Sequence, residues 1–395
     1  MSAKRIIFLT EHFSPSAAAT AQLAVDLSTS LAKKGHQVIA LTATASRSKE
    51  QQKLDNITVH RLNISKKLGK SIPAKALSGI NYMLLALHWC LINAKKSDQL
   101  IIFSNPPYSG ILGALIKLVK RVDYIFIFQD LFPRSAVLSG VLPATGPITG
   151  LWQLLMSIIC SQAKYTITLS EAMKDRLKID LFFESEIRVI HNWAVERGVP
   201  GEWKGNDFAR RNNLGNKLTI QYSGNFGRLH DLMTLLETSR ILDQSLFDFC
   251  FIGDGAKKNQ ITNYKEYFNL KNVHIFPYQS RQSLPVSLAA CDMSVIGLMP
   301  GAEDTVSPCK FYGIIASGKA VILVAQEDCD IAQFVLRHKI GLVVEPGESE
   351  LLATKLIELN NNKSILADMQ MNAHRIYTEH FGLDKSIDLY EKILG

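Results

Sequence analysis

The chain has 395 residues, of which 47% are hydrophobic and 20% are charged, a balance that excludes disordered and fibrous proteins. This length exceeds what one hydrophobic core usually serves, so two domains are expected. The net charge of +8 is uneven, because residues 1–195 hold 23 Lys+Arg and 12 Asp+Glu (+11), whereas residues 196–395 hold 21 and 24 (−3). We therefore expect an anionic partner for the first half, with plain surface solubility as the alternative.

The first half alternates short apolar runs with helical patterns. The runs predict strands at Ile6–Leu9, Val38–Thr42, Ile57–Leu62, Leu100–Phe103, Tyr124–Phe128, Thr166–Leu169 and Val189–Ile190. Between the first two runs, Gln22–Lys34 has leucines at helical spacing, and Gly35 follows as a stop signal. Strands that alternate with helices indicate a parallel, doubly wound α/β sheet.

A polar segment, residues 196–215, precedes a second half in which apolar runs again alternate with helical patterns. Its apolar runs predict strands at Leu218–Tyr222, Phe249–Ile252, Val273–Phe276, Met293–Gly297, Val321–Val324 and Leu342–Val344. We expect Rossmann-like domains at 1–195 and 196–378, and a C-terminal helix within 379–395 that packs back on the first domain. Such domains bind ligands at the carboxyl ends of their strands, so a site in the cleft between them is expected.

The strongest local signal opens the second domain, where the strand Leu218–Tyr222 runs into a glycine-rich turn and a helix near Leu229. Glycines let the backbone approach a ligand, and a helix N-terminus behind them favours phosphate. An arginine in the turn adds a bidentate phosphate donor. The donor-binding candidates are Gly224, Asn225, Phe226 and Gly227, with Arg228 as a catalytic candidate. A tight loop with a surface arginine is the alternative.

Two later segments extend this candidate site. A Gly-Asp-Gly turn at 253–255 allows close packing against a ligand or against the next loop. Residues 300–322 carry acidic groups and a serine for sugar hydroxyls, and a lysine on a helix that Pro308 starts and Gly318 ends. The candidates are catalytic Glu303 and Lys310, and donor-binding Gly253, Tyr278 (against the nucleotide base), Asp304 and Ser307. A plain turn and a capped surface helix are the alternatives.

The first domain offers two acceptor-side candidates. Ser14 follows the first strand, ahead of a run of small residues, 16–20, that keeps the mouth of a cleft open. Asp130 follows the strand Tyr124–Phe128 and is therefore expected at a carboxyl end of the sheet. A capping or turn role is the alternative for Asp130.

The six cysteines show no Cys-x-x-Cys spacing and have no neighbouring histidine cluster, so neither a zinc site nor a disulfide framework is expected. They suit a reducing compartment. The N-terminus shows no secretory signal, and the most apolar helical pattern, Tyr82–Asn93, is too short to span a bilayer. We expect a cytoplasmic protein without a metal or other cofactor.

Taken together, these segments resemble the retaining glycosyltransferases of family 4, which have the GT-B fold. The similarity extends over nearly the whole chain. It rests on Lys34-Gly35-His36-Gln37-Val38, Ile190-His191-Asn192-Trp193, Gly224 to Arg228, Gly253-Asp254-Gly255 and Ala316 to Ile322. The Ser-Pro-x-Lys and Gly-Asn-Phe-Gly forms are similar to members that build bacterial exopolysaccharide and O-antigen units.

The resemblance implies transfer of a hexosyl group from a nucleotide-diphosphate sugar to a glycan acceptor, with the anomeric configuration retained. The leaving diphosphate takes the acceptor's proton, and Arg228, Lys310 and a helix N-terminus stabilise its growing charge. The basic first half favours a lipid-linked acceptor and an anionic membrane surface, so a protein peripheral to the inner face of the plasma membrane is expected. No nucleic acid partner is expected.

The chain departs from the family pattern at three places. Gly313 stands where the family has the second glutamate of its E-x7-E motif, and Glu303 or Asp304 is the candidate for the first. Met233 stands where the family has a lysine, so we expect Lys310 to supply that cation. Alanines at 17–19 replace the paired glycines of the family's first loop.

Three other interpretations stay open at this point. An inactive nucleotide-sugar-binding relative fits the departures. A nucleotide-sugar 2-epimerase has a similar fold and converts its donor without any acceptor. A nucleic-acid-binding protein fits the basic pI of about 9.0, although the basic residues lack interleaved aromatic residues.

Overall fold

The computed structural model describes residues 3–16, 19–44, 51–54, 56–64, 72–195, 198, 200–201, 203–280 and 282–395, with the backbone course alone at 51 and 72–76. The chain divides into two compact units, Met1–His191 with Asp384–Gly395, and Asn192–Leu383. The first residue of the expected second domain, Glu196, and two alanines of the first loop, Ala17 and Ala18, lie outside the described residues.

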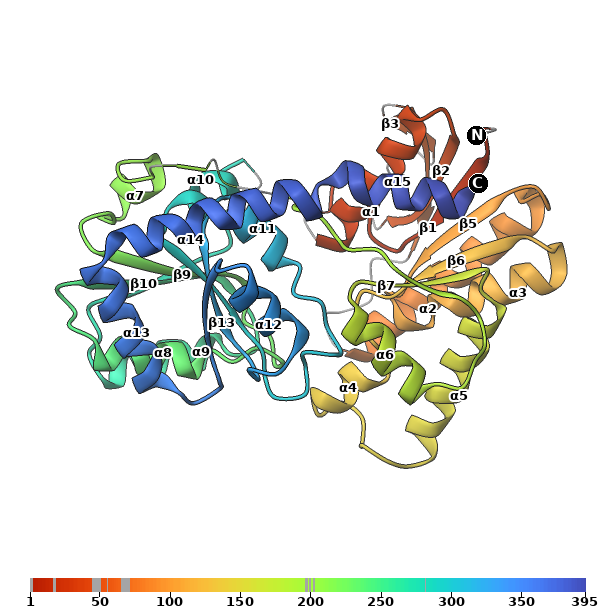
Figure 1. Cartoon of the computed structure of the whole chain (residues 1–395). Helices are drawn as coiled ribbons and strands as arrows, with labels where there is room; N and C mark the ends of the chain where they lie inside the picture. Colours follow the sequence, from red (N-terminus) through yellow and green to blue (C-terminus); the bar gives the residue numbers. More distant parts are fainter. Residues whose placement is uncertain are drawn as a thin grey trace. The chain divides into compact units, whose positions relative to one another are not determined.

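The first unit is built around an eight-stranded sheet in the order β3-β4-β2-β1-β5-β6-β7-β8 (Figure 1). Its strands are β1 Arg5–Leu9, β2 Gln37–Thr44, β3 Gln51–Leu54, β4 Ile57–Asn63, β5 Gln99–Phe103, β6 Asp123–Ile127, β7 Tyr165–Thr168 and β8 Ile187–Val189. Neighbouring strands are parallel except β3 and β4. Seven of these strands match the expected apolar runs. The strand β3 escapes the pattern because Gln51-Gln52-Lys53 is polar.

Helices cover this sheet between successive strands (Figure 1). They are α1 Ala19–Lys33, α2 Ile72–Asn93, α3 Gly110–Lys120, α4 Arg134–Leu138, α5 Pro147–Gln162 and α6 Glu171–Asp180, with a 3-10 turn at Pro107–Ser109. The helix α3 packs beside both α2 and α5. The helix α1 ends as expected, because the positive φ of 98° at Gly35 lets its amide bond to the carbonyl of Ala32 (3.0 Å). No helix in the described part of the chain is long and apolar enough to cross a membrane.

The C-terminal helix α15, Leu383–Leu394, belongs to the first unit from Asp384 onward. Nε2 of His36 lies 2.9 Å from the Glu391 carboxylate, and both side chains are buried. The backbone amide of Lys4 donates to Nδ1 of the same ring (3.0 Å), so Nε2 carries the proton that is donated to Glu391. The histidine of the Gly-His pair thus holds the end of the chain on this unit.

The second unit contains a six-stranded parallel sheet in the order β11-β10-β9-β12-β13-β14. Its strands are β9 Leu218–Asn225, β10 Phe247–Asp254, β11 Val273–Phe276, β12 Met293–Gly297, β13 Ala320–Val324 and β14 Gly341–Val344. All six coincide with expected runs, so the chain has the two expected Rossmann-like sheets. Strand order reverses between β9 and β12, the place where doubly wound sheets bind ligands.

Helices again connect the strands of this unit (Figure 1). They are α7 Asp207–Arg211, α8 Met233–Ile241, α9 Lys258–Tyr267, α10 Leu284–Ala289, α11 Lys310–Ala316, α12 Asp330–Arg337, α13 Ser349–Asn361 and α14 Lys363–Ile376, followed by a π-helical turn at Tyr377–Phe381. The helix α8 begins at Met233 and not near Leu229, because the Asp231 carboxylate accepts a hydrogen bond from the Thr234 amide (3.0 Å) and caps the helix there.

The helix α11 also begins later than expected. Pro308 precedes the helix and does not lie in its first turn, which starts at Lys310. The expected end is correct. Gly318 has a φ of 62°, and the Lys319 amide donates to the Ile314 carbonyl (3.1 Å), which closes the last turn.

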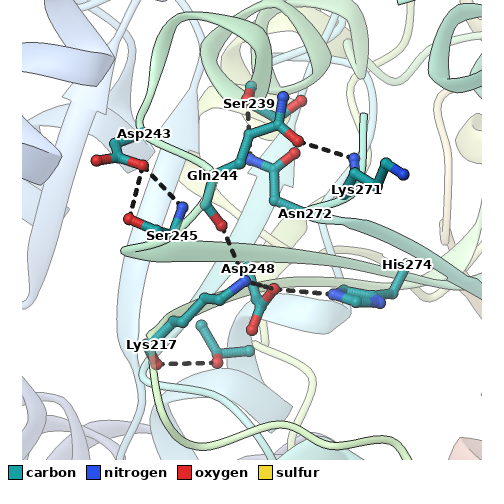
Figure 2. Close-up of polar contacts among 10 residues, drawn as sticks. Lys217, Ser239, Asp243, Gln244, Ser245, Asp248, Lys271, Asn272 and His274 are labelled. Atoms are coloured by element: carbon teal, nitrogen blue, oxygen red, sulfur yellow. Dashed lines mark hydrogen bonds and ion pairs between the residues drawn. The ribbon is translucent and has the colours of Figure 1, made fainter. Parts of the chain in front are cut away.

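A polar network closes the amino edge of the second sheet (Figure 2). The buried carboxylate of Asp248 on β10 accepts a hydrogen bond from Lys217 (3.3 Å) and lies 2.9 Å from Nε2 of His274 on β11. Lys217 also donates to the Gln244 carbonyl (2.8 Å). Because a buried carboxylate is stable only with such partners, this network ties β9, β10 and β11 together at the edge away from the carboxyl ends of the strands.

We expect Asp248→Ala to destabilise the second unit by about 1–3 kcal/mol, since it leaves Lys217 and His274 without their common partner. Thermal unfolding followed by circular dichroism measures this change. Asp243→Ala is the matched control, because Asp243 is exposed and bonds only within its own turn, to Ser245. An equal loss of stability in the two variants would contradict the structural role of Asp248.

Candidate functional site

The donor-side candidates gather at the carboxyl edge of the second sheet. The strand β9 ends in the turn 223–228, β10 ends in the turn 253–255, and β12 is followed by the segment 298–309 that leads into α11. Gly224 pairs with Gly253 in the register of β9 and β10, so the two glycine turns lie side by side. This is the edge, and the point of strand reversal, at which doubly wound sheets bind ligands.

Phe226 fixes the first turn to the core of the unit. Its ring is fully buried in the core of the unit, and its amide donates to the Asp254 carbonyl (2.8 Å). Its carbonyl accepts from the Lys257 amide (3.0 Å). The Phe226 side chain therefore anchors the turn in the core, and its assignment to donor binding stays a prediction.

The second turn packs against the first. A Cβ on Gly253 would lie 2.0 Å from the Gly224 carbonyl oxygen, and a Cβ on Gly255 would lie 2.6 Å from Oδ1 of Asn225. Both glycines also have positive φ (145° and 150°). Of the two roles open to this motif, packing against the neighbouring loop is the one that explains its glycines.

Lys310 reaches from the first residue of α11 to the end of β9. Its Nζ lies 3.6 Å from the centre of the Tyr222 ring, a cation–π contact. A Cβ on Gly224 would lie 2.6 Å from Lys310 Cε, so the glycine makes room for the lysine. Nζ is buried and has no hydrogen-bond partner among the described residues. Burial lowers the pKa of Lys310 from 10.5 to about 7.

His230 and Tyr222 surround this lysine, and the sequence did not single out either. Nδ1 of His230 lies 2.9 Å from the Asn225 carbonyl oxygen and 2.8 Å from the Tyr222 hydroxyl. That hydroxyl donates to the Asn225 carbonyl (2.8 Å). Burial, followed by the nearby charge of Lys310, lowers the pKa of His230 to about 4, so its ring is neutral. A lone histidine near a loop arginine gives no sequence signal for this role.

An unpartnered buried ammonium is costly, and the turn around it is fixed by hydrogen bonds. A site that lacks water and carries a fixed positive charge binds an anion more strongly than an exposed lysine does. The arrangement is therefore suited to hold a phosphate group.

The other donor-side candidates lie around this edge in different settings. Arg228 lies on the exposed turn that follows Gly227, with its side chain in solvent. Tyr278 is 56% exposed, and its hydroxyl donates to the Asp254 carbonyl (3.3 Å), which places it beside the second turn. Both are accessible to a ligand, and their contacts with one stay a prediction.

The acidic candidates and Ser307 hold their own segment in place. Oε1 of Glu303 accepts from the Gln326 amide (3.3 Å), and Oδ1 of Asp304 accepts from the hydroxyl of the next residue (2.9 Å). Ser307 hydrogen-bonds with the phenol of Tyr312, whose burial raises its pKa. These contacts order the segment between β12 and α11, and their contact with a sugar stays a prediction.

The acceptor-side candidates lie in the first unit. Ser14 is in the loop after β1, where its carbonyl accepts a hydrogen bond from the Arg61 guanidinium (2.7 Å). Asp130 follows β6 at the carboxyl edge of that sheet, as the sequence led us to expect, and the residue is exposed. Among the described residues, no group of three His, Cys, Asp or Glu side chains is placed to hold a metal ion.

Comparison with known proteins identifies both halves of the chain. Residues 20–194 match the family described as Glycosyltransferase Family 4, and residues 204–376 match the family described as Glycosyl transferases group 1. The "Probable glycosyltransferase WbjE" of Pseudomonas aeruginosa is 24% identical over 295 residues, which cover 74% of each chain. WcaI of Escherichia coli (strain K12), assigned by its name to colanic acid biosynthesis, is 30% identical over 189 residues, which cover 42% of this chain and 46% of WcaI.

Solved structures share the fold at low sequence identity. Sucrose-phosphate synthase from Thermosynechococcus elongatus superposes with a TM-score of 0.80 at 15% identity, over 99% of each chain. Anabaena HepE, solved in complex with UDP and glucose, superposes with a TM-score of 0.72 at 15% identity, again over 99% of each chain. The two family matches follow one another along the chain with the expected two-sheet architecture, and the chain belongs to the glycosyltransferases of the GT-B fold.

Proposed function

We propose that this protein transfers a hexosyl group, with retention of configuration, from a nucleotide-diphosphate sugar to a lipid-linked glycan in bacterial cell-surface polysaccharide synthesis. The names of its relatives support the polysaccharide assignment, since WcaI is assigned to colanic acid biosynthesis. The complex of HepE with UDP and glucose supports a nucleotide-sugar donor. The observation that carries the proposal is the buried, unpartnered ammonium of Lys310 beside Gly224.

Lys310 is proposed to bind the donor diphosphate. In the transferase reaction the bond between the sugar and the diphosphate breaks, and negative charge grows on the leaving diphosphate. A positive group fixed in place before the reaction stabilises that charge more than water can, because it need not reorganise. Arg228 is exposed on the neighbouring turn. It is proposed to bind the same diphosphate when the donor is at the carboxyl edge of the second sheet.

The reaction is proposed to proceed on one face of the sugar, with the leaving diphosphate accepting the proton of the acceptor hydroxyl. This route requires no metal and no covalent link to the protein. Ser14 and Asp130, from the loops that follow β1 and β6, are proposed to bind the acceptor. Gly313 offers no carboxylate for the donor ribose, and Glu303 or Asp304 is proposed to take the place of the first acid of the E-x7-E motif.

Replacing either cation is expected to lower kcat on the order of 10²–10³-fold while the protein stays folded, since each removes one stabilising group from the transition state. Lys310→Met and Arg228→Ala are the variants, assayed by sugar transfer. Lys310→Met is also expected to raise the free energy of unfolding on the order of 1–3 kcal/mol, because it removes a buried charge without a partner.

A lower kcat together with a higher free energy of unfolding in Lys310→Met indicates that Lys310 binds the donor. A structural role would instead lower both. Lys271→Met removes one charge from an exposed position at the other edge of the sheet and serves as the control. Turnover at the wild-type rate in Lys310→Met or Arg228→Ala refutes the assigned role. A loss of stability in Lys310→Met would show that its charge is already satisfied in the free protein.

The pH dependence of donor binding follows from the lowered pKa of Lys310. Between about 7 and 10.5 the unfolded chain holds this proton and the folded chain does not, so the group's contribution to the free energy of unfolding rises with pH over that range. UDP requires the charged ammonium, so its affinity is expected to fall above about pH 7, by up to about tenfold per pH unit. Calorimetric titration measures this slope, and Lys310→Met is expected to flatten it. An equal slope in the two proteins contradicts the assignment.

The donor class is tested by thermal shift with UDP-, GDP-, ADP- and TDP-sugars, because a ligand that binds only the folded state raises Tm. We expect one nucleotide to stand out, with UDP favoured by the complex of HepE. Product analysis without an acceptor then separates transfer from 2-epimerisation, since only an epimerase alters the sugar in that mixture. If no nucleotide sugar raises Tm, the donor assignment is wrong.

A further inference from the structure

Three neighbouring helices of the first unit present large apolar side chains to solvent. The pairs Leu84 and Ile92 on α2, Leu118 and Val119 on α3, and Leu151 and Leu154 on α5 are all more than half exposed, with Leu118 at 79%. Because α3 packs beside both α2 and α5, these side chains share one side of the unit. We call this surface, formed by the outer sides of α2, α3 and α5, the apolar face.

An exposed apolar face of this size is expected to bind a partner that covers it. Soluble monomers rarely expose large contiguous apolar surfaces unless a protein or a membrane binds there. On α5 the exposed apolar side chains recur every three or four residues, from Ile148 to Ile158, over a helix of 16 residues, or about 24 Å. The sequence of α5 contains no charged residue.

The charges on the three helices themselves are of one sign. The sequences of α2, α3 and α5 contain no Asp or Glu. Each helix ends next to cations, which we call the basic rim: Lys95, Lys96, Lys120, Arg121 and Lys164. Three acidic residues at this edge of the sheet are paired, Asp98 with Arg5 (2.6 Å), Asp123 with Lys117 (3.1 Å) and Glu186 with Arg188 (2.5 Å), and Glu184 is an exposed acid beside them.

The basic rim lies along a single edge. Its residues lie within four positions before β5, β6 and β7. The first residues of β5 and β6 pair, Gln99 with Asp123, and the first residue of β7, Tyr165, pairs with Ile125 two residues into β6. The amino ends of those three strands lie side by side, so the cations before them do as well. An apolar face bordered by a row of cations is the pattern of a protein surface that lies on anionic lipid, with apolar side chains in the acyl boundary and cations at the headgroups.

We propose that the apolar face and the basic rim of the first unit dock on an anionic lipid bilayer. This surface deepens the proposed function and rests on it in one respect, since a lipid-linked acceptor has to be met at a membrane. The face begins near the acceptor side, because α5 follows the loop that carries Asp130 at the carboxyl end of β6. A protein partner with a matching acidic rim, or a second copy of this chain, is the competing occupant.

Vesicle flotation of the full chain tests the proposal. We expect it to float with vesicles of phosphatidylcholine mixed with phosphatidylglycerol, to float far less with phosphatidylcholine alone, and to be released by salt. The double variant Leu118→Asp with Leu151→Asp is expected to bind at least about tenfold more weakly, since two large apolar side chains are lost from the lipid contact. Lys96→Gln with Arg121→Gln is expected to reduce the preference for anionic vesicles.

The matched control places the same substitutions on another exposed helix. Leu351 and Ile357 on α13 of the second unit are 42% and 46% exposed, so Leu351→Asp with Ile357→Asp makes the same change of charge and replaces two exposed aliphatic side chains without touching the face. This control is expected to float as the wild type does. Circular dichroism and Tm establish that all variants are folded.

Three outcomes overturn the proposal. The wild type does not float with anionic vesicles, or the face variant floats as well as the control, or sedimentation shows a dimer that Leu118→Asp with Leu151→Asp dissociates while vesicles have no effect. The last outcome assigns the face to a second copy. The Tm shift produced by UDP is measured on the same proteins and is expected to be equal in the wild type and the face variant. Flotation without a UDP shift would leave the surface standing and refute the proposed donor.

Discussion

The structure of the second unit's carboxyl edge depends on one interaction, the burial of the Lys310 ammonium against the face of Tyr222. The contact of 3.6 Å brings a cation into a place where no described residue accepts its hydrogen bonds. An aromatic face compensates only part of the cost of removing an ammonium from water, and the lowered pKa of Lys310 reflects the remainder. Under the proposed function, this cost is offset when the donor diphosphate binds beside the ammonium.

The surrounding loops are arranged to make this contact possible. Gly224 leaves the space that the lysine stem occupies, and the neutral ring of His230 holds the turn without adding a second positive charge. The glycines of the second turn bring β10 close behind β9. Gly224 is thus explained by packing against the lysine, and Gly253 and Gly255 are explained by packing against the turn that carries Gly224.

The sequence predicts the sheets well because their strands are buried on both faces and appear as continuous apolar runs. It fails at β3, whose polar residues pair only with β4 at the sheet edge, and at the start of α8, which a single aspartate side chain decides. The fold class, the two glycine turns and the positions after β6 and β9 could all be predicted, since they depend on local pattern and on the carboxyl-end rule.

The site itself could be predicted only in part. That Lys310 meets Tyr222 depends on β9 lying next to β12 in the sheet, and strand order is not encoded in any local pattern. His230 escaped notice because an isolated histidine has no periodic or motif signal. The glycine-rich turn indicates a ligand-binding loop, but the burial of the Phe226 ring beneath it depends on the core of the folded unit and has no local signal. Residues that act through tertiary neighbours are the ones that one sequence does not reveal.

A crystal structure of the protein with UDP bound measures the central claim most directly. The account predicts that the β-phosphate lies within hydrogen-bond distance of Lys310 Nζ, close to the backbone of Gly224, with the Tyr222 contact retained. A diphosphate bound elsewhere in the second unit, with Lys310 still buried and unpartnered, would contradict it.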